Sequence, residues 1–147
     1  MFKFLKELLF KDRTSDHVFR ISHYDNCGND LFEYTQLQIL SCISYEFEIK
    51  CIIKNYNSIK TVIDIASKNE LCNSIKIICN KFPESIITSD KVTIHIISNK
   101  PKYQGILIGS NEVLYDKGKN MATVVLNCSD PSIKLYNDYW NKLLNSN

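Results

Sequence analysis

Residues 91–128 constrain the fold of this chain more than any other stretch. The segment reads KVTIHIISNKPKYQGILIGSNEVLYDKGKNMATVVLNC, in which short runs rich in Val, Ile, Leu and Tyr are separated by Gly, Asn, Lys or Pro. These runs predict strands at 92–97, 103–108, 112–115 and 122–126. Such a block forms a sheet, but a sheet buries its faces only when other segments pack on it. The rest of the chain must supply those covering layers.

The stretch before this block alternates between strand and helix patterns. Strands are predicted at 17–25, 47–53 and 74–79. Helices are predicted at 31–44, where Asp30 and Glu33 have capping-box spacing, and from Asn57 as a possible N-cap to about residue 69. Helical crossovers between strands favour parallel neighbours in one sheet.

Both ends of the chain have helical patterns. Asp130 followed by Pro131 predicts a helix start, with Asp as N-cap and Pro at the first helical position, and Trp140 lies on its apolar face. Residues 1–13 form an amphipathic pattern that suits either a terminal helix docked on the domain or an attachment to a membrane surface or partner through residues 1–11.

Together these patterns predict a single α/β domain over 1–147, with its core at 17–145. We expect a mixed sheet in which parallel, helix-crossed N-terminal strands join an antiparallel C-terminal strand block, and helices cover the sheet.

Charge and cysteine usage limit the function classes. The net charge is +2 and no run of like charges exceeds two residues, so binding to nucleic acid is not strongly indicated. The six cysteines have no C-x-x-C spacing and most lie in apolar runs, which is typical of free, buried thiols in a reducing compartment. We therefore expect a soluble, cytoplasmic protein.

The histidines are the first candidates for chemistry near neutral pH. His17 and His23 lie six positions apart on a predicted strand, and with Cys27 or Asp25 they would approach a metal-ligand set, but nothing in the spacing defines such a site. His95 lies between two isoleucines of a predicted strand, where a structural histidine is the simpler interpretation. No metal or cofactor is expected.

Nucleotide-binding and hydrolase motifs are absent from the sequence, including G-x-x-x-x-G-K-[ST], G-x-G-x-x-G and G-x-S-x-G. Glu112, Asp116 and Lys117 contain the residue types of a metal-dependent nuclease, but Asp116 and Lys117 belong to a segment with turn composition. Gly109 and Ser110 are interpreted as a hairpin connection.

The order of these elements over residues 30–145 resembles one half of the phospholipase D-like superfamily. The segment YQGILIGSNEVLY (103–115) is similar to that family's motif strand and its return strand, and SDPSIKLYNDYWNKLL (129–144) is similar to the closing helix of its regulatory members. The resemblance implies a homodimer, because catalytic members pair two motif halves and this chain holds one. The ligand pocket would then lie across the dimer axis.

The catalytic motif of that family, H-x-K-x-x-x-x-D, is not retained. Lys102 stands where the resemblance places His, Gln104 where it places Lys, and Gly109 where it places Asp. A protonated lysine is no nucleophile and a glutamine cannot neutralise a phosphate, so the substitutions argue against phosphodiester cleavage. They do not argue against binding, because Lys100 and Lys102 can hold an anion as point charges.

These observations lead to a non-catalytic, homodimeric ligand-sensing or interaction domain, with His95, Lys100, Lys102 and Gln104 as candidate binding residues for an anionic small ligand or a protein partner. Two alternatives stay open. One is a small nuclease or phosphodiesterase that uses His95 with Lys100 or Lys102, and the other is a membrane-surface or partner-binding protein that acts through residues 1–11.

Overall fold

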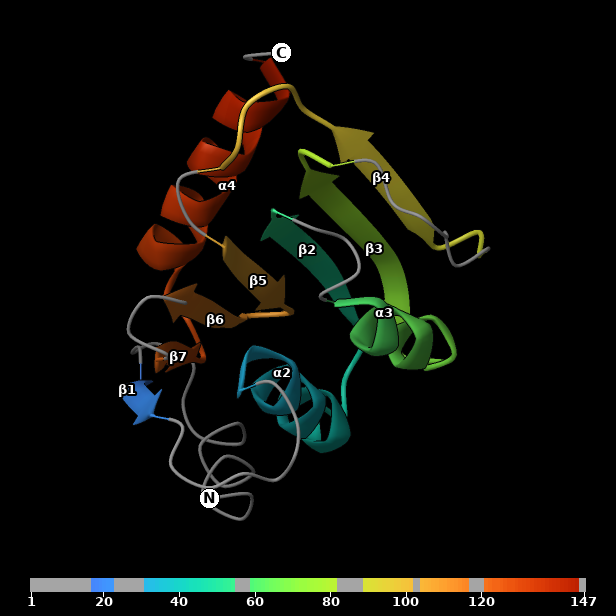
Figure 1. The fold of residues 1–147 in the computed structure, drawn as a ribbon. Helices are drawn as coiled ribbons and strands as arrows, with labels where there is room; N and C mark the ends of the chain where they lie inside the picture. The colour runs from blue at the N-terminus through green and yellow to red at the C-terminus, as the bar shows by residue number, and fades with distance from the viewer. Residues whose placement is uncertain are drawn as a thin grey trace.

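The predicted strands assemble into one seven-stranded sheet with the order β1-β7-β6-β5-β2-β3-β4 (Figure 1). The computed structural model describes residues 17–22, 31–54, 59–81, 89–101, 104–116 and 121–145, and the side chains of 17–22, 31–32, 115–116 and 121–122 are not described. The strands are β1 (His17–Ser22), β2 (Phe47–Ile53), β3 (Cys72–Cys79), β4 (Val92–Ile96), β5 (Gln104–Ile108), β6 (Asn111–Asp116) and β7 (Met121–Leu126). The described helices are α2 (Leu31–Cys42), α3 (Lys60–Ser67) and α4 (Asp130–Asn145).

The predicted α/β class with a mixed sheet is confirmed. β2, β3 and β4 are parallel neighbours, whereas β5 pairs antiparallel with β2 and β6, and β7 pairs antiparallel with β6 and β1. The membership of the two halves differs from the expectation. The first strand, β1, belongs to the antiparallel half at one edge of the sheet, and β4 belongs to the parallel half at the other edge.

Burial explains why the predicted four-strand block is split between the two halves of the sheet. β5 has an almost continuous buried run from Gly105 to Ile108, whereas β4 is mostly exposed or half-buried. A strand that is apolar on both faces needs neighbours on both sides and cover above and below it, which only an interior position provides. The chain therefore passes from the edge at β4 across the sheet to pair β5 with β2.

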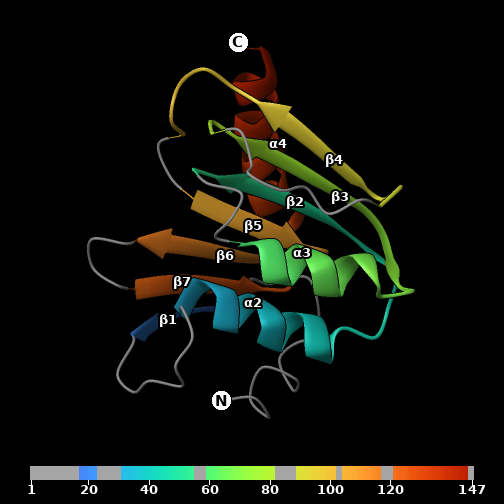
Figure 2. The ribbon, with the colours of Figure 1, turned by 45° about the vertical axis from the view of Figure 1, so that its right-hand side comes forward.

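Helices cover the two faces of the sheet unequally (Figure 2). α2 and α3 pack on one face over the larger hydrophobic cluster, which includes Ile49 and Cys51 of β2, Ile63 of α3 and Ile106 of β5. α4 packs on the opposite face over a smaller cluster centred on Tyr136 and Trp140, which also includes the following residues from the sheet and its connections: Ile52, Ile78, Ile97 and Leu107.

Two helix starts differ from the sequence prediction. In α4 the carbonyl of Ser129 accepts the hydrogen bond from the Ile133 amide (3.1 Å), so Ser129 occupies the N-cap position and Asp130 lies in the first turn. In α3 the N-cap position belongs to Ile59, which has no side-chain capping bond. Asn57 and the predicted helix at 1–13 lie outside the described residues.

The interpretation of the cysteines as small buried hydrophobes is confirmed for the described ones. Cys42, Cys51, Cys72, Cys79 and Cys128 are all free and buried. Cys27 lies outside the described residues. Across the described part of the chain, no helix has the length and apolar character that crossing a membrane requires.

Candidate functional site

The predicted binding residues lie at different parts of the sheet. Gln104 is the first residue of β5, and its Oε1 accepts a hydrogen bond from the backbone amide of Lys54 at the end of β2 (3.3 Å). Lys100 is exposed in the connection between β4 and β5. Lys102 lies outside the described residues. His95 is exposed on β4, at the edge of the sheet.

His95 and Gln104 are not brought together. β2 and β3 lie between their strands, and the two side chains point to opposite faces. His95 pairs in register with Ile78, which packs under α4, whereas Gln104 shares its face with Ile106, in the cluster under α2 and α3. A single pocket formed by His95 and Gln104 is therefore not a feature of one protomer.

The position that resembles the motif aspartate is a turn glycine. Gly109 has φ +63 and its amide donates to the carbonyl of Glu48 (2.8 Å), which holds the β5–β6 turn against β2. A Cβ at this position would lie 3.4 Å from the Phe47 Cβ and 3.4 Å from the Tyr45 hydroxyl. A Cβ would thus meet its neighbours at about ordinary contact distance, and it is the positive φ that favours glycine at this position.

The other candidate sets remain incomplete in the structure. His17 begins β1, while His23, Asp25 and Cys27 lie outside the described residues. Glu112 lies on β6 and Lys117 is outside the described residues. Among the residues that are described, no three His, Cys, Asp or Glu side chains gather as metal ligands would.

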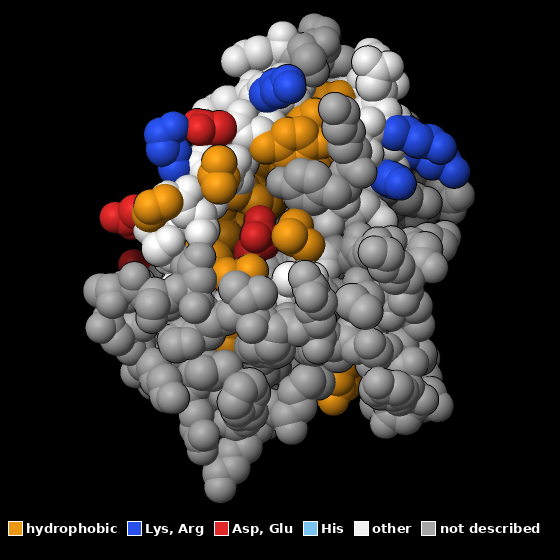
Figure 3. All heavy atoms as spheres, turned by 90° about the vertical axis from the view of Figure 1, so that its left-hand side faces the viewer, with side chains coloured by type: hydrophobic (Ala, Val, Ile, Leu, Met, Phe, Trp, Pro, Cys, Tyr) orange, Lys and Arg blue, Asp and Glu red, His pale blue; other side chains and the backbone are white. Residues whose placement is uncertain are grey.

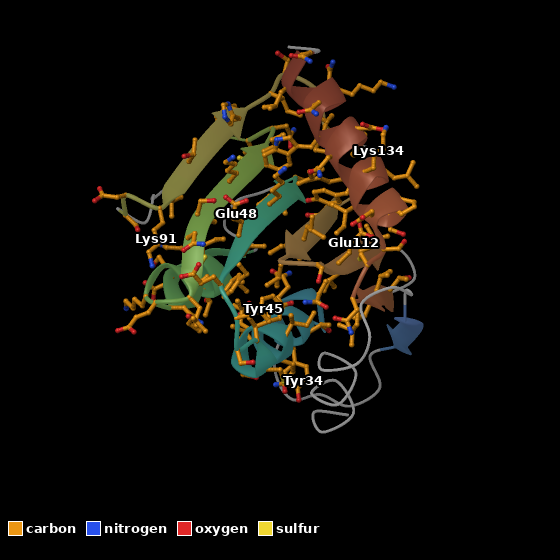
Figure 4. The ribbon with its side chains drawn as sticks, turned by 180° about the vertical axis from the view of Figure 1, so that it is seen from behind. Tyr34, Tyr45, Glu48, Lys91, Glu112 and Lys134 are labelled. Carbon is orange, nitrogen blue, oxygen red and sulfur yellow. The ribbon has the colours of Figure 1, made fainter. Side chains whose placement is uncertain are left out.

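One hollow of the described surface is a pocket beside α4, which we call the α4 pocket. It has a volume of about 530 Å³, within the range of small-molecule sites. Its wall includes side chains from the first half of β2, the start of β3, the end of β5 and the first half of α4: Glu48, Lys50, Asn73, Leu107, Ile133 and Asn137. Figure 4 shows Glu48 on the part of the sheet that α4 leaves open, and Tyr45 farther toward α2.

Lys50 is the central cation of the α4 pocket. Its Nζ donates to Oδ1 of Asn137 on α4 (2.7 Å) and lies 5.7 Å from the centre of the Trp140 ring. Burial lowers the pKa of the Lys50 ammonium from its ordinary 10.5, nearby Lys76 lowers it further, and Glu48 opposes the change. The positive charge of Lys50 is thus less stabilised in the folded protein than in water.

Lys50 belongs to a polar row across the open face of the sheet, which we call the basic row. Lys50 of β2, Lys76 of β3 and Thr93 of β4 are paired in register, so they share one face with neighbouring strands about 4.8 Å apart. The adjacent row holds Glu48, whose Oε1 accepts a hydrogen bond from the Ser74 hydroxyl (2.9 Å). His95 lies on the same face, two residues after Thr93 on β4, where it pairs with Ile78 of β3.

Tyr136 hydrogen-bonds α4 to the strands beside this pocket. Its hydroxyl donates to the carbonyl oxygen of Lys50 (2.8 Å) and lies 3.2 Å from that of Gly105. The backbone of Lys50 is therefore held to β5 and α4 together, while its side chain reaches Asn137. The position of the ammonium is set by α4.

The sequence reasoning missed Lys50 and Lys76. The available signal was a lysine in the middle of each apolar strand, FEIKCII and SIKIIC, at positions that a parallel pairing places side by side. That pairing depends on strand register, which the local pattern does not specify.

The visible charges do not form a continuous field of one sign. Figure 3 shows basic and acidic side chains of the described residues scattered over one face, some of them side by side, with hydrophobic side chains among them.

Comparison with protein-family models, with curated proteins and with solved structures finds no match for this chain.

Proposed function

We propose that this chain is a non-catalytic ligand-sensing or interaction domain with a degenerate phospholipase D-like fold, acting as a homodimer. The order of elements supports this proposal. The parallel strands β2 and β3, connected through α3, and then β4 precede β5; β6 returns beside β5, β7 follows, and α4 is the last described element. This is the order that the resemblance of segments 103–115 and 129–144 implies.

The observation that carries the non-catalytic assignment is the structure of β5 and its turn. Gln104 is hydrogen-bonded to the backbone of Lys54, and Gly109 has a positive φ in the turn between β5 and β6. The two positions that would supply a cation and a carboxylate to phosphodiester chemistry instead have local structural roles. Attack on phosphorus would lack its acid, its base and its nucleophile here.

The proposal places a binding site where catalytic relatives of this fold would join two halves. Lys100 and Lys102 would present positive charge beside Gln104, and a second copy would present the same groups across a two-fold axis. His95, separated from β5 by β2 and β3 in each protomer, would meet such a site only at its margin. The free, buried thiols fit a reducing compartment such as the cytoplasm.

The test combines mass and activity on one preparation. Light scattering after size exclusion gives the oligomeric state, and hydrolysis of bis(4-nitrophenyl) phosphate and of DNA gives phosphodiesterase activity. We expect a dimer without turnover. A monomer would remove the homodimer, and turnover that is lost in His95→Ala but retained in Lys68→Gln would establish the competing phosphodiesterase.

A further inference from the structure

The basic row is the strongest unexplained feature of the described surface. It lies on the open part of the face that α4 covers, beside a pocket of about 530 Å³. It is separate from the start of β5, because Gln104 points to the opposite face of the sheet. The proposed homodimer does not depend on Lys50, Lys76 or Thr93.

The first observation is a pair of like charges that no ion pair of the described residues neutralises. Lys50 and Lys76 are directly opposite on adjacent parallel strands, and like charges at opposed positions destabilise a sheet. The ion pairs within the described residues, Lys68 with Asp64 and Lys134 with Asp138, include neither of these lysines.

The second observation is the arrangement of the nearest acid. Glu48 is in the neighbouring row, with its Oε1 already accepting from Ser74. It raises the pKa of Lys50 less than burial and Lys76 lower it. The α4 pocket therefore has an acidic end at Glu46 and Glu48 and a basic end at Lys50, and the basic end continues onto the sheet at Lys76.

The third observation is that two ammonium groups share one face of the sheet at the basic end. The Lys50 ammonium is half-buried and hydrogen-bonded to Asn137, and Lys76 is exposed at the paired position of the next strand. A half-buried, positioned ammonium next to an exposed one suits an oxyanion, which can accept from both at once. Leu107 and Ile133 line the adjacent wall and can contact an apolar portion of the same molecule.

We propose that the α4 pocket binds a small oxyanion, a carboxylate or a phosphate, between Lys50 and Lys76, with the rest of the ligand lying along α4. This site is distinct from the dimer-axis site proposed at the start of β5 and would be a second binding site of the same domain. Because Lys50 is hydrogen-bonded to Asn137, occupancy of this site acts directly on the contact that joins α4 to the sheet. A bound anion would thereby stabilise α4 on the sheet.

The experiment measures binding of sodium phosphate and of sodium acetate by calorimetry and by thermal unfolding, against sodium chloride at equal ionic strength. We expect one of the two oxyanions to bind and to raise the unfolding temperature beyond the chloride control. Lys76→Gln is the principal variant, because this side chain is exposed and its loss does not threaten folding. Its affinity should fall by about tenfold or more, the effect of losing one charge-assisted hydrogen bond.

Lys68→Gln is the matched control. It removes the same charge from an exposed lysine that follows α3, on the opposite face of the sheet. It should bind the oxyanion as the wild type does. Whether phosphate or acetate binds identifies which oxyanion chemistry the site takes.

Equal binding by Lys76→Gln and Lys68→Gln, or no binding beyond the chloride control, would overturn the proposal. Binding that survives Lys76→Gln and disappears in Lys100→Gln would assign the anion to the start of β5 instead. These failures leave a dimeric, non-hydrolysing domain standing. A monomer or a hydrolysing protein would remove the proposed function whatever anion binds.

Discussion

The turn between β5 and β6 shows how single residues determine local structure in this protein. Gly109 has a positive φ at the first turn position, as a type II′ hairpin requires. Asn111, fully buried, donates through Nδ2 to the carbonyl of Ile108 (3.1 Å) and accepts through Oδ1 from the amide of Asn127 (3.0 Å). The turn is therefore joined to the segment that leads into α4.

Replacing Gly109 by alanine tests the strain at this turn. The left-handed backbone costs an L-residue about 1–2 kcal/mol, so Gly109→Ala should lower the free energy of unfolding in urea by that amount. Ser110→Ala is the neighbouring control. The Ser110 hydroxyl is buried and has no hydrogen-bond partner among the described residues, so its removal should change stability by no more than about 0.5 kcal/mol or be slightly stabilising. Equal losses in both variants would contradict a conformational role for Gly109.

At the scale of elements, α4 shows how a single helix packs on one face of the sheet. Tyr136 and Trp140 are nearly fully buried and lie one turn apart, with ring centres separated by 6.5 Å. Leu135, on the same helix, is 72% exposed. The i,i+4 ion pair between Lys134 and Asp138 is exposed on both sides and adds little to stability. The two aromatic side chains are thus the most deeply buried part of the attachment of α4, with Ile133, Tyr139, Leu143 and Leu144 packed around them.

Substitutions along α4 should separate these contributions. Tyr136→Phe keeps the ring and removes the hydrogen bond to the Lys50 carbonyl, at a cost of about 1 kcal/mol. Trp140→Ala leaves a cavity in the smaller cluster and should cost about 3–5 kcal/mol. Leu135→Ala should stay within about 0.5 kcal/mol of the wild type. Chemical denaturation measures all three, and a Trp140→Ala loss as small as that of Leu135→Ala would show that α4 is not held by this cluster.

At the scale of the whole molecule, the larger cluster links stability to pH through buried thiols. Burial raises the pKa of Cys51 well above its ordinary 9.0, and burial also raises the pKa of Cys72 and Cys79. These residues lie on adjacent central strands, β2 and β3, and belong to the same hydrophobic cluster. The folded protein therefore keeps thiols protonated at a pH where the unfolded chain ionises them.

The consequence is a loss of stability in alkali. Below pH 9.0 the thiols are protonated in both states, and the stability is unaffected by them. Above that value the unfolded chain releases protons that the folded protein retains, so the free energy of unfolding falls by up to about 1.4 kcal/mol per pH unit for each such thiol. Urea denaturation under reducing conditions at a series of pH values measures this slope.

Cys51→Ala provides the comparison for that slope. Its stability should be lower near neutral pH because a buried side chain is shortened, but its decline above pH 9.0 should be shallower than that of the wild type. Parallel declines in the two proteins would mean that the Cys51 thiol ionises equally in both states and would refute the linkage.

The sequence by itself determined the local structure. Alternation and apolar runs place all of the observed strands, and helical spacing places α2, α3 and α4 to within a few residues. The Gly109–Ser110 hairpin and the burial of the cysteines also follow from local composition. These features depend on residues close together in the chain, because neighbouring residues determine both the backbone preference and the periodicity of burial.

Only the tertiary structure decided which strands are neighbours and which side chains meet. β5 does not pair with β4, which precedes it in the chain. It lies beside β2 in the interior of the sheet, because its apolar residues need cover on both faces. That arrangement put His95 and Gln104 on opposite faces, and the parallel register of β2 and β3 placed Lys50 beside Lys76. Strand order and register are properties of long-range packing, in which a shift of one residue reverses every side chain, so no local pattern could have specified them.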